Sequence, residues 1–247
     1  MTPEAHKNSD FLGTEDARHI RILADYAYAD SVLEKEKIKD TIVIFGSARI
    51  KPSEINKGLL AKYYEETEII SKKLTEWSIS ISSKGTQDRL LVCTGGGPGI
   101  MEAGNKGAWL AGGRSIALNI KLPHEQYPNP YVVPGLTFTF HYFFMRKLWF
   151  ISLAKAVVVM PGGFGTIDEL FESLTLIQTK RSHKIPVVLY GSEFWKKVIN
   201  WEYLLENELI DRADLSLFYY SDDVNDTVDY LKKSIDLSLT ETPNIKN

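Results

Sequence analysis

The sequence predicts an α/β protein: a Rossmann-like three-layer sandwich with a mostly parallel sheet and helices on both faces. Three observations predict this fold. Continuous apolar runs, typical of strands covered on both faces, alternate with segments of helical periodicity. Three of the runs end in glycine-rich turns, which begin at Gly46, Gly95 and Gly162. Because the carboxyl ends of parallel strands share one edge of a sheet, we expect the three turns to meet there.

The expected strands cover residues 41–45, 90–94, 115–120, 155–160 and 185–190, with a short last strand at 215–220. The expected helices cover residues 14–36, 52–77, 100–111, 141–153, 194–206 and 222–237, and one more runs from the third glycine turn to about residue 180. Residues 78–89 read as a surface loop, and residues 121–136, with four prolines, as a long ordered loop near a site. Pro186 indicates that the fifth strand is less central than the others.

Length and composition favour one domain over residues 1–247, with a loose N-terminus at 1–13, an additional N-terminal helix at 14–36 and a disordered tail at 238–247. A net charge of −3 gives no basic surface for nucleic acid. The single cysteine, Cys93, lies in an apolar strand, so we expect a small core residue in a reducing compartment. No apolar run has membrane-spanning length, and residues 1–13 lack the apolar segment of a signal peptide. We therefore expect a cytoplasmic protein without a membrane partner.

The segment from Pro161 to Glu169, with the sequence PGGFGTIDE, is the main functional signal. It follows a buried strand and begins a helix. Glycines let backbone amides approach a ligand closely, and the helix start adds unpaired N–H groups and the positive end of the helix dipole. These features suit an anion such as phosphate, and Thr166 adds a hydroxyl. A simple phosphate site would not need the carboxylate of Glu169, which makes that residue the best functional clue.

A structural alternative exists for Glu169. The spacing of Thr166 and Glu169 also fits a capping box, in which the glutamate accepts a hydrogen bond from the amide of the threonine. The two alternatives compete for the same N–H group, and the spacing alone leaves both open.

The glycine spacing argues against a dinucleotide. The third glycine of a G-x-G-x-x-G pattern is replaced by Ile100 in one turn and by Asp168 in the other, and no acidic residue ends the third strand. A P-loop sequence is also absent. A mononucleotide or sugar-phosphate ligand remains.

Three motifs together resemble the LOG ("lonely guy") family: GGGPGIME at 95–102, Met145-Arg146-Lys147, and PGGFGTIDE at 161–169. The last matches the family signature Pro-Gly-Gly-x-Gly-Thr-x-x-Glu at every fixed position, and the likeness covers roughly residues 40–210. Many such sequences carry the older label "lysine decarboxylase-like". The resemblance implies a Rossmann-type fold, a homodimer with sites near the interface, and no cofactor.

The implied reaction is hydrolysis of a nucleoside 5′-monophosphate to a free base and ribose 5-phosphate. Short plant-type members, which activate cytokinins, usually have glycine where Glu102 stands and lack the helix at 14–36. Both differences are similar to a longer bacterial subgroup and favour plain AMP as the substrate.

The resemblance implies two catalytic residues. Cleavage of an N-glycosidic bond builds positive charge on the ribose, as in glycoside hydrolysis, and Glu169 is the candidate that stabilises this charge or activates water. Arg146 is the second candidate and would stabilise the departing base or clamp the phosphate. Its neighbour Lys147 points about 100° away on the helix, so we expect only Arg146 of the two to reach the substrate, and keep Lys147 as a binding candidate.

The other candidates bind substrate, and we expect no metal ligands. The phosphate would contact the glycine turn and Thr166, and the second glycine turn would line the opposite wall near the ribose. Glu102 is either a ribose ligand or an acid that stabilises its helix start. The substrate-binding candidates are Ser47, Gly96, Gly97, Gly99, Glu102, Lys147, Gly162, Gly163, Gly165 and Thr166.

Two other functions remain open. One is a non-catalytic nucleotide-binding or signalling module. The other is the amino-acid decarboxylase of the older label, which would need a lysine that forms a Schiff base with pyridoxal phosphate. Lys147 beside Arg146 offers no evident arrangement for that chemistry.

Overall fold

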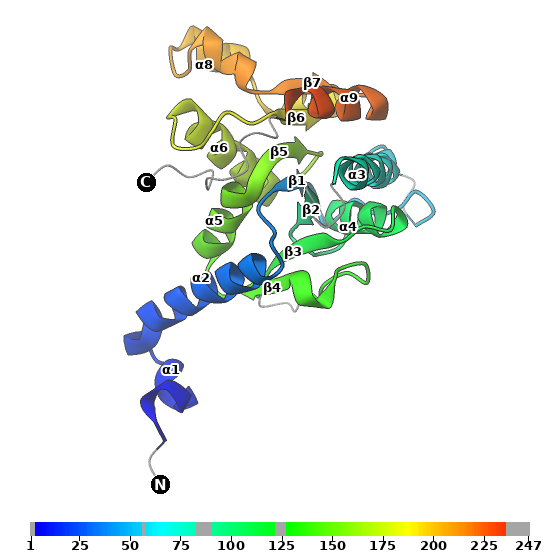
Figure 1. Ribbon diagram of the computed structural model, residues 1–247. Helices are drawn as coiled ribbons and strands as arrows, with labels where there is room; N and C mark the ends of the chain where they lie inside the picture. The colour runs from blue at the N-terminus through cyan, green and yellow to red at the C-terminus, as the bar shows by residue number, and fades with distance from the viewer. Residues whose placement is uncertain (1–2, 56–57, 83–89, 122–126, 236–247) are drawn as a thin grey trace.

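The computed structural model describes residues 3–55, 58–82, 90–121 and 127–235. These residues form a seven-stranded sheet with helices on both faces, which confirms the predicted Rossmann-like three-layer fold (Figure 1). The strand order is β4-β3-β2-β1-β5-β6-β7, and each neighbouring pair is parallel. The strands are β1 Thr41–Phe45, β2 Leu91–Thr94, β3 Ser115–Ile120, β4 Thr137–Phe140, β5 Ala154–Val159, β6 Val187–Tyr190 and β7 Tyr219–Ser221.

The order in which strands are added to the sheet reverses between β1 and β5, although all strands are parallel. Strands β1 to β4 extend the sheet outward on one side, and β5 then returns to pair with β1 before β6 and β7 extend it on the other side. The turns after β1 and β5 therefore lie next to each other at the carboxyl edge. In an open parallel sheet this crevice is the usual ligand site.

Two layers of helices cover the sheet (Figure 1). One layer contains α3 (Lys62–Ile81), α4 (Ile100–Leu110) and α9 (Val224–Ser234). The other contains α2 (Arg18–Lys35), α5 (Phe143–Leu153) and α6 (Phe164–Gln178). None of the described helices is both long and apolar enough to cross a membrane.

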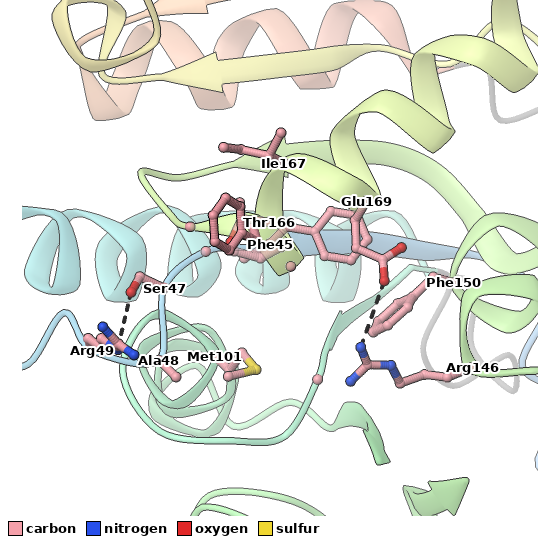
Figure 2. Close-up of a pocket in the computed structure, with 16 residues that line it drawn as sticks. Phe45, Ser47, Ala48, Arg49, Met101, Arg146, Phe150, Thr166, Ile167 and Glu169 are labelled. Atoms are coloured by element: carbon pink, nitrogen blue, oxygen red, sulfur yellow. Dashed lines mark hydrogen bonds and ion pairs between the residues drawn. The ribbon is translucent and has the colours of Figure 1, made fainter. Parts of the chain in front are cut away.

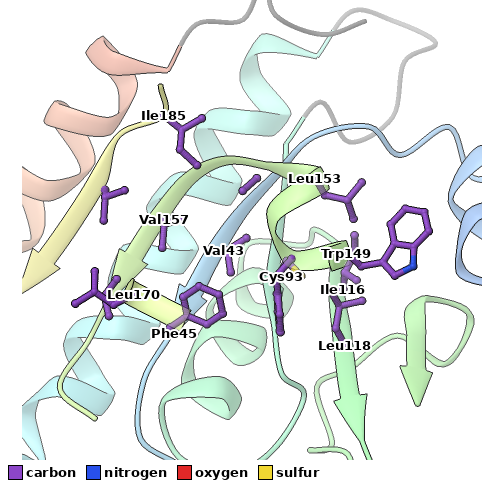
Figure 3. Close-up of a cluster of buried hydrophobic side chains, with 14 of the residues drawn as sticks. Val43, Phe45, Cys93, Ile116, Leu118, Trp149, Leu153, Val157, Leu170 and Ile185 are labelled. Atoms are coloured by element: carbon purple, nitrogen blue, oxygen red, sulfur yellow. The ribbon is translucent and has the colours of Figure 1, made fainter. Parts of the chain in front are cut away.

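Alternate residues of each strand serve two separate cores. In β1, Val43 and Phe45 belong to the cluster under α2, α5 and α6, whereas Ile42 and Ile44 pack under α3 and α4. Figure 3 shows the first cluster, which includes Cys93. Cys93 is fully buried, as the apolar strand predicted. Both faces of the sheet are thus apolar, and polar side chains that could bind a ligand are expected at the ends of the strands.

Several predicted boundaries were wrong. The second helix begins at Lys62, not near residue 52, because Ser53 turns back and donates from its amide and its hydroxyl to Glu65 in the first helical turn. That helix continues to Ile81, into the predicted loop at 78–89; the rest of that loop, 83–89, lies outside the described residues.

A strand was missed after the proline-rich segment. β4 pairs with β3 through Phe138 and Phe140, both buried, and lies between the predicted loop at 121–136 and the predicted helix at 141–153. The following helix begins at Phe143 instead of residue 141. Residues 122–126 of the predicted loop lie outside the described residues.

The C-terminal third also differs in detail. The helix predicted at 194–206 is two helices, α7 (Ser192–Val198) and α8 (Trp201–Glu206), because Asn200 caps a new helix by accepting from the Tyr203 amide. The first half of the strand predicted at 215–220 belongs to the 3₁₀ helix η4 (Arg212–Leu217), and the strand itself, β7, begins at Tyr219. Pro186 lies just before β6, which has a neighbour on each side. The predicted tail at 238–247 lies outside the described residues.

The N-terminal segment is partly helical. The described part of the predicted loose segment 1–13 contains the short 3₁₀ helix η1 (Ala5–Lys7) and the one-turn helix α1 (Ser9–Leu12). The helix predicted at 14–36 is the 3₁₀ turn η2 (Glu15–Ala17) followed by α2.

Candidate active site

A pocket of about 540 Å³ lies at the carboxyl edge, where the three glycine turns meet (Figure 2). The turn after β1 contributes residues 46–49, the turn after β2 contributes Gly95, and the start of α6 contributes residues 163–167 and Glu169. Arg146 and Phe150 of α5 and Met101 of α4 complete its wall. The predicted meeting of the three turns is therefore confirmed, and the volume is within the range of small-molecule sites.

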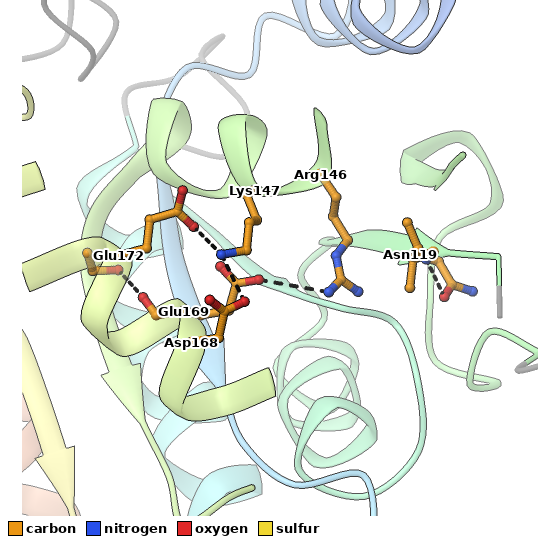
Figure 4. A network of polar contacts seen from close by, with 8 residues as sticks. Asn119, Arg146, Lys147, Asp168, Glu169 and Glu172 are labelled. Carbon is orange, nitrogen blue, oxygen red and sulfur yellow. Dashed lines mark hydrogen bonds and ion pairs between the residues drawn. The ribbon is translucent and has the colours of Figure 1, made fainter. Parts of the chain in front are cut away.

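Glu169 and Arg146 face each other across this pocket. The Arg146 Nη2 atom lies 3.8 Å from the Glu169 Oε1 atom, and both side chains are largely buried (Figure 4). The Glu169 Oε2 and Arg146 Nε atoms are buried without a hydrogen-bond partner among the described residues. Buried polar atoms are almost always paired in folded proteins, so two unpaired atoms at one pocket mark this pair as unusual.

The capping alternative for Glu169 is wrong. Helix α6 starts at Phe164, with Gly163 as its N-cap and no side-chain cap, so Thr166 already lies inside the helix. Thr166 is therefore not an N-cap with which Glu169 could form a capping box. The Glu169 carboxylate points toward Arg146 instead.

Burial dominates the electrostatics of the pair. Desolvation raises the pKa of Glu169 to about 7, although the positive charges of Lys147 and Arg146 oppose this shift. Burial likewise lowers the pKa of the Arg146 guanidinium, and the Glu169 carboxylate partly offsets that change. A carboxyl group that titrates near neutral pH can act as an acid or as a base, a property common at catalytic sites.

The start of α6 forms the second wall of the pocket. The amides of Phe164, Gly165 and Thr166 occupy its first turn, where no earlier carbonyl can accept their hydrogens. A Cβ atom added at Gly163 or Gly165 would meet nothing within 4 Å. The fold therefore does not require glycine at either position; the missing side chains leave open space beside the amides.

Gly162 has a different role. A Cβ atom there would lie 2.1 Å from the Thr166 Oγ1 atom, so the close approach of this glycine to the helix requires the absence of a side chain. Gly162 is thus a packing residue, and Thr166 lines the pocket directly.

Lys147 does not line the pocket. Its ammonium group lies 2.8 Å from a carboxylate oxygen of Asp168 and 2.8 Å from one of Glu172, and so bridges α5 to α6 (Figure 4). Of the two neighbouring cations, only Arg146 faces the pocket. Their 100° separation on the helix explains this arrangement.

The second glycine turn reaches the pocket through other residues than expected. Gly95 and Met101 line the cavity, whereas Gly96, Gly97 and Gly99 do not. Gly99 packs so closely on the β1 turn that a Cβ atom would lie 2.5 Å from the Ser47 carbonyl oxygen. Glu102 points elsewhere as well: it accepts a hydrogen bond of 3.0 Å from the Tyr64 hydroxyl of α3.

A buried amide that sequence reasoning missed holds this turn in place. The Asn129 Nδ2 group donates to the carbonyl oxygens of Gly96 and Gly97, at 3.1 and 3.0 Å, and to the Asn105 Oδ1 atom at 2.9 Å. An asparagine between prolines resembles any loop residue, so only the fold reveals its position.

The turn after β1 contributes Ser47 and Arg49. Ser47 was a binding candidate and lines the pocket, and its Oγ accepts a hydrogen bond of 3.1 Å from the Arg49 amide. Arg49 also lines the pocket but was not among the candidates. A cation in a small-residue turn directly after a strand is a pattern from which it could have been predicted. Among the described residues, no cluster of histidine, cysteine and carboxylate side chains could hold a metal ion.

The fold and this pocket define an α/β protein with a glycine-rich pocket at the switch point of a parallel sheet. The family model described as "Possible lysine decarboxylase" matches residues 101–231, more than half of the chain. The chain belongs to this family and is a LOG-type protein. No curated relative matches the chain.

Two solved structures share the fold. The X-ray structure of TM1055, a structural genomics target, aligns with a TM-score of 0.57 and 21% identity, over 78% of this chain and 99% of that one. The molybdenum cofactor binding protein from the phototrophic bacterium Rippkaea orientalis aligns with a TM-score of 0.50 and 18% identity, over 79% and 96%. At these identities the likeness shows the fold alone.

Proposed function

We propose that the protein is a phosphoribohydrolase that cleaves the N-glycosidic bond of a nucleoside 5′-monophosphate, with AMP as the favoured substrate. One observation carries the proposal. A buried carboxylate, Glu169, and a buried guanidinium, Arg146, face the same pocket as the amides that begin α6. Such a pocket can hold a sugar by its phosphate and place an acid beside the ring.

The chemistry follows from the charges. As the bond between C1′ and the base breaks, its electron pair leaves with the base and the ribose becomes positively charged. The ionised Glu169 carboxylate stabilises this charge and accepts a proton from the attacking water, whose oxygen bonds to C1′. The departing base gains a proton from solvent and Glu169 releases the one it took from water, so the carboxylate is regenerated. Arg146 either stabilises the negative charge on the base or clamps the phosphate.

The phosphate would bind at the start of α6. The amides of Gly163 and Gly165 and the hydroxyl of Thr166 provide the donors, and the helix dipole favours the negative charge. The open space at both glycines supports this assignment, because a phosphate oxygen needs the volume that a side chain would occupy.

The homodimer is also part of the proposal. Phe164 is 94% exposed at the edge of the pocket, and Phe143 and Phe144 are about half exposed at the start of α5. A second copy that covered these rings would bury apolar surface next to the site. Light scattering coupled to size-exclusion chromatography measures the mass in solution directly.

The binding-only alternative has one observation in its favour, since a structure with the same fold is titled as a cofactor binding protein. The decarboxylase alternative has less support. The described residues that line the pocket include no lysine, and Lys147 is paired with two carboxylates.

The decisive experiment incubates purified protein with AMP and measures adenine and ribose 5-phosphate by chromatography. The wild-type protein should release both in equal amounts, and Glu169→Gln should be slower by roughly 10²- to 10⁴-fold. Glu206→Gln, an exposed glutamate on α8, is the matched control and should keep full activity. If AMP and a panel of other nucleoside monophosphates bind but stay intact, the protein is a binding module.

A further inference from the structure

The helix that carries Arg146 begins without a cap from its own segment. The N-cap residue of α5 is Tyr142, whose side chain makes no capping hydrogen bond. The first amides of a helix need acceptors from elsewhere. An uncapped start frays, and Arg146 lies in the first turns of this helix.

A residue far away in the sequence provides an acceptor next to this helix start. The Asp25 Oδ2 atom, on α2, accepts hydrogen bonds from the amides of His141 at 2.9 Å and Tyr142 at 3.2 Å. The negative charge of Asp25 also lies at the positive end of the α5 dipole. Asp25 therefore anchors the two residues that lead into α5, although it does not accept from the amides inside the first turn.

Tyr142 links this contact to Arg146. Its amide donates to Asp25, and its carbonyl oxygen accepts from the Arg146 amide at 3.3 Å and from the Met145 amide at 3.2 Å. The backbone of Arg146 is thus two hydrogen bonds away from the Asp25 carboxylate.

A second contact joins the same two helices. The ring of Tyr26 stacks on that of Trp149, with centroids 5.2 Å apart and planes 27° apart. Helix α2 therefore holds α5 on both sides of Arg146.

The Arg146 guanidinium contacts two aromatic rings and the Glu169 carboxylate. Its guanidinium carbon lies 5.0 Å from the centroid of the Phe143 ring and 5.8 Å from that of Phe150, and its Nε atom has no partner among the described residues. The 3.8 Å separation from Glu169 is longer than a hydrogen bond. Both rings are on α5 as well, so a shift in the start of this helix would move the guanidinium relative to Glu169.

We propose that Asp25 is a positioning residue, which sets the place of Arg146 in the pocket by anchoring the start of α5 to the N-terminal helix. Its catalytic consequence rests on the proposed hydrolase function. Its structural consequence does not, so the two can fail separately.

The kinetic test compares Asp25→Ala, Asp25→Asn and a matched control, Asp30→Ala, from the same helix, for AMP cleavage by the full chain. Misplacement of a catalytic group lowers kcat, so Asp25→Ala should lose roughly tenfold or more in kcat with little change in KM. Asp25→Asn keeps one acceptor oxygen and should recover part of the loss. In an Arg146→Ala background Asp25→Ala should have no further effect, whereas a purely structural defect would add to the loss.

The second readout needs no activity. Hydrogen exchange measured by NMR should show faster exchange of the Met145 and Arg146 amides in Asp25→Ala, by about fivefold for a lost hydrogen-bonded anchor of ~1 kcal/mol. Asp30→Ala should leave these rates unchanged. Unchanged exchange in both Asp25 variants would overturn the proposal. If exchange rises but wild-type protein cleaves no nucleotide, the positioning stands and the hydrolase function fails.

Discussion

Arg146 and Glu169 are placed together by the two helices that flank one strand. Arg146 lies on α5, which leads into β5, and Glu169 lies on α6, which leaves β5, and their charged ends are 3.8 Å apart. Because β5 is a central, fully buried strand, both helices are connected to the interior of the sheet. The pair is therefore preorganised by the fold, as catalysis requires of charged groups.

Gly163 and Gly165 should be needed for ligand binding and not for folding. Gly165→Ala should leave the free energy of unfolding unchanged or raise it by up to ~1 kcal/mol, since alanine is the better helix former. Its affinity for AMP, measured by calorimetry, should fall at least tenfold, because the new methyl group fills the space beside the amides. Gly135→Ala, equally free of neighbours but distant, is the control. Unchanged affinity in Gly163→Ala and Gly165→Ala would place the phosphate elsewhere.

The raised pKa of Glu169 has a defined effect on stability. Its folded-state pKa of about 7 is above the ordinary value of 4.5, so the folded protein binds this proton more tightly than the unfolded chain. The stabilisation is complete below pH 4.5 and is lost as the pH rises to about 7. Relative to Glu169→Gln, the wild-type protein should lose about 3 kcal/mol across this window, measured by urea unfolding. A pH-independent difference between the two proteins would contradict the shift.

Lys147 should control the pH at which the site works. Its positive charge lowers the pKa of Glu169, so Lys147→Met should raise that pKa further. The catalytic rate, which needs the ionised carboxylate, should then rise at a higher pH than in the wild-type protein. Lys147→Arg keeps the charge between Asp168 and Glu172 and should restore most of the profile. Equal pH–rate profiles for all three proteins would exclude this role.

Asn129 should stabilise the protein through its donors. Asn129→Ala removes two N–H groups that serve the oxygens of Gly96, Gly97 and Asn105. Such loss should lower the free energy of unfolding by about 1–3 kcal/mol. Asn129→Asp, with the same shape but no donor, should be at least as destabilised. An aspartate variant as stable as the wild type would show that shape, not hydrogen bonding, matters at this position.

The sequence predicted most of what depends on local pattern. The strands of residues 41–45 and 115–120 have the predicted bounds, because continuous apolar runs next to glycine turns are unambiguous. The pocket between the three turns also followed from the general geometry of parallel sheets. Glu169 stood out because a carboxylate at an anion site is unexpected.

Features that depend on contacts between residues far apart in the chain could not be predicted from local sequence patterns. The strand at 137–140 is stabilised by pairing with β3, which its own aromatic sequence does not specify. The capping alternative failed because the helix starts at Phe164, three residues earlier than an N-cap at Thr166 would require. The bonds from Asn129 and to Asp25 join segments that are far apart in the chain, so no local pattern marks them.

The adjacency of β1 and β5 also has a consequence for how the site comes into being. One wall of the pocket is synthesised with β1, and the other only after β5, more than a hundred residues later. Until those two strands pair, a nascent chain has no complete pocket for the ligand. A ligand that contacts both turns would stabilise the pairing of β1 with β5, so its binding would indicate that the two halves of the sheet have joined.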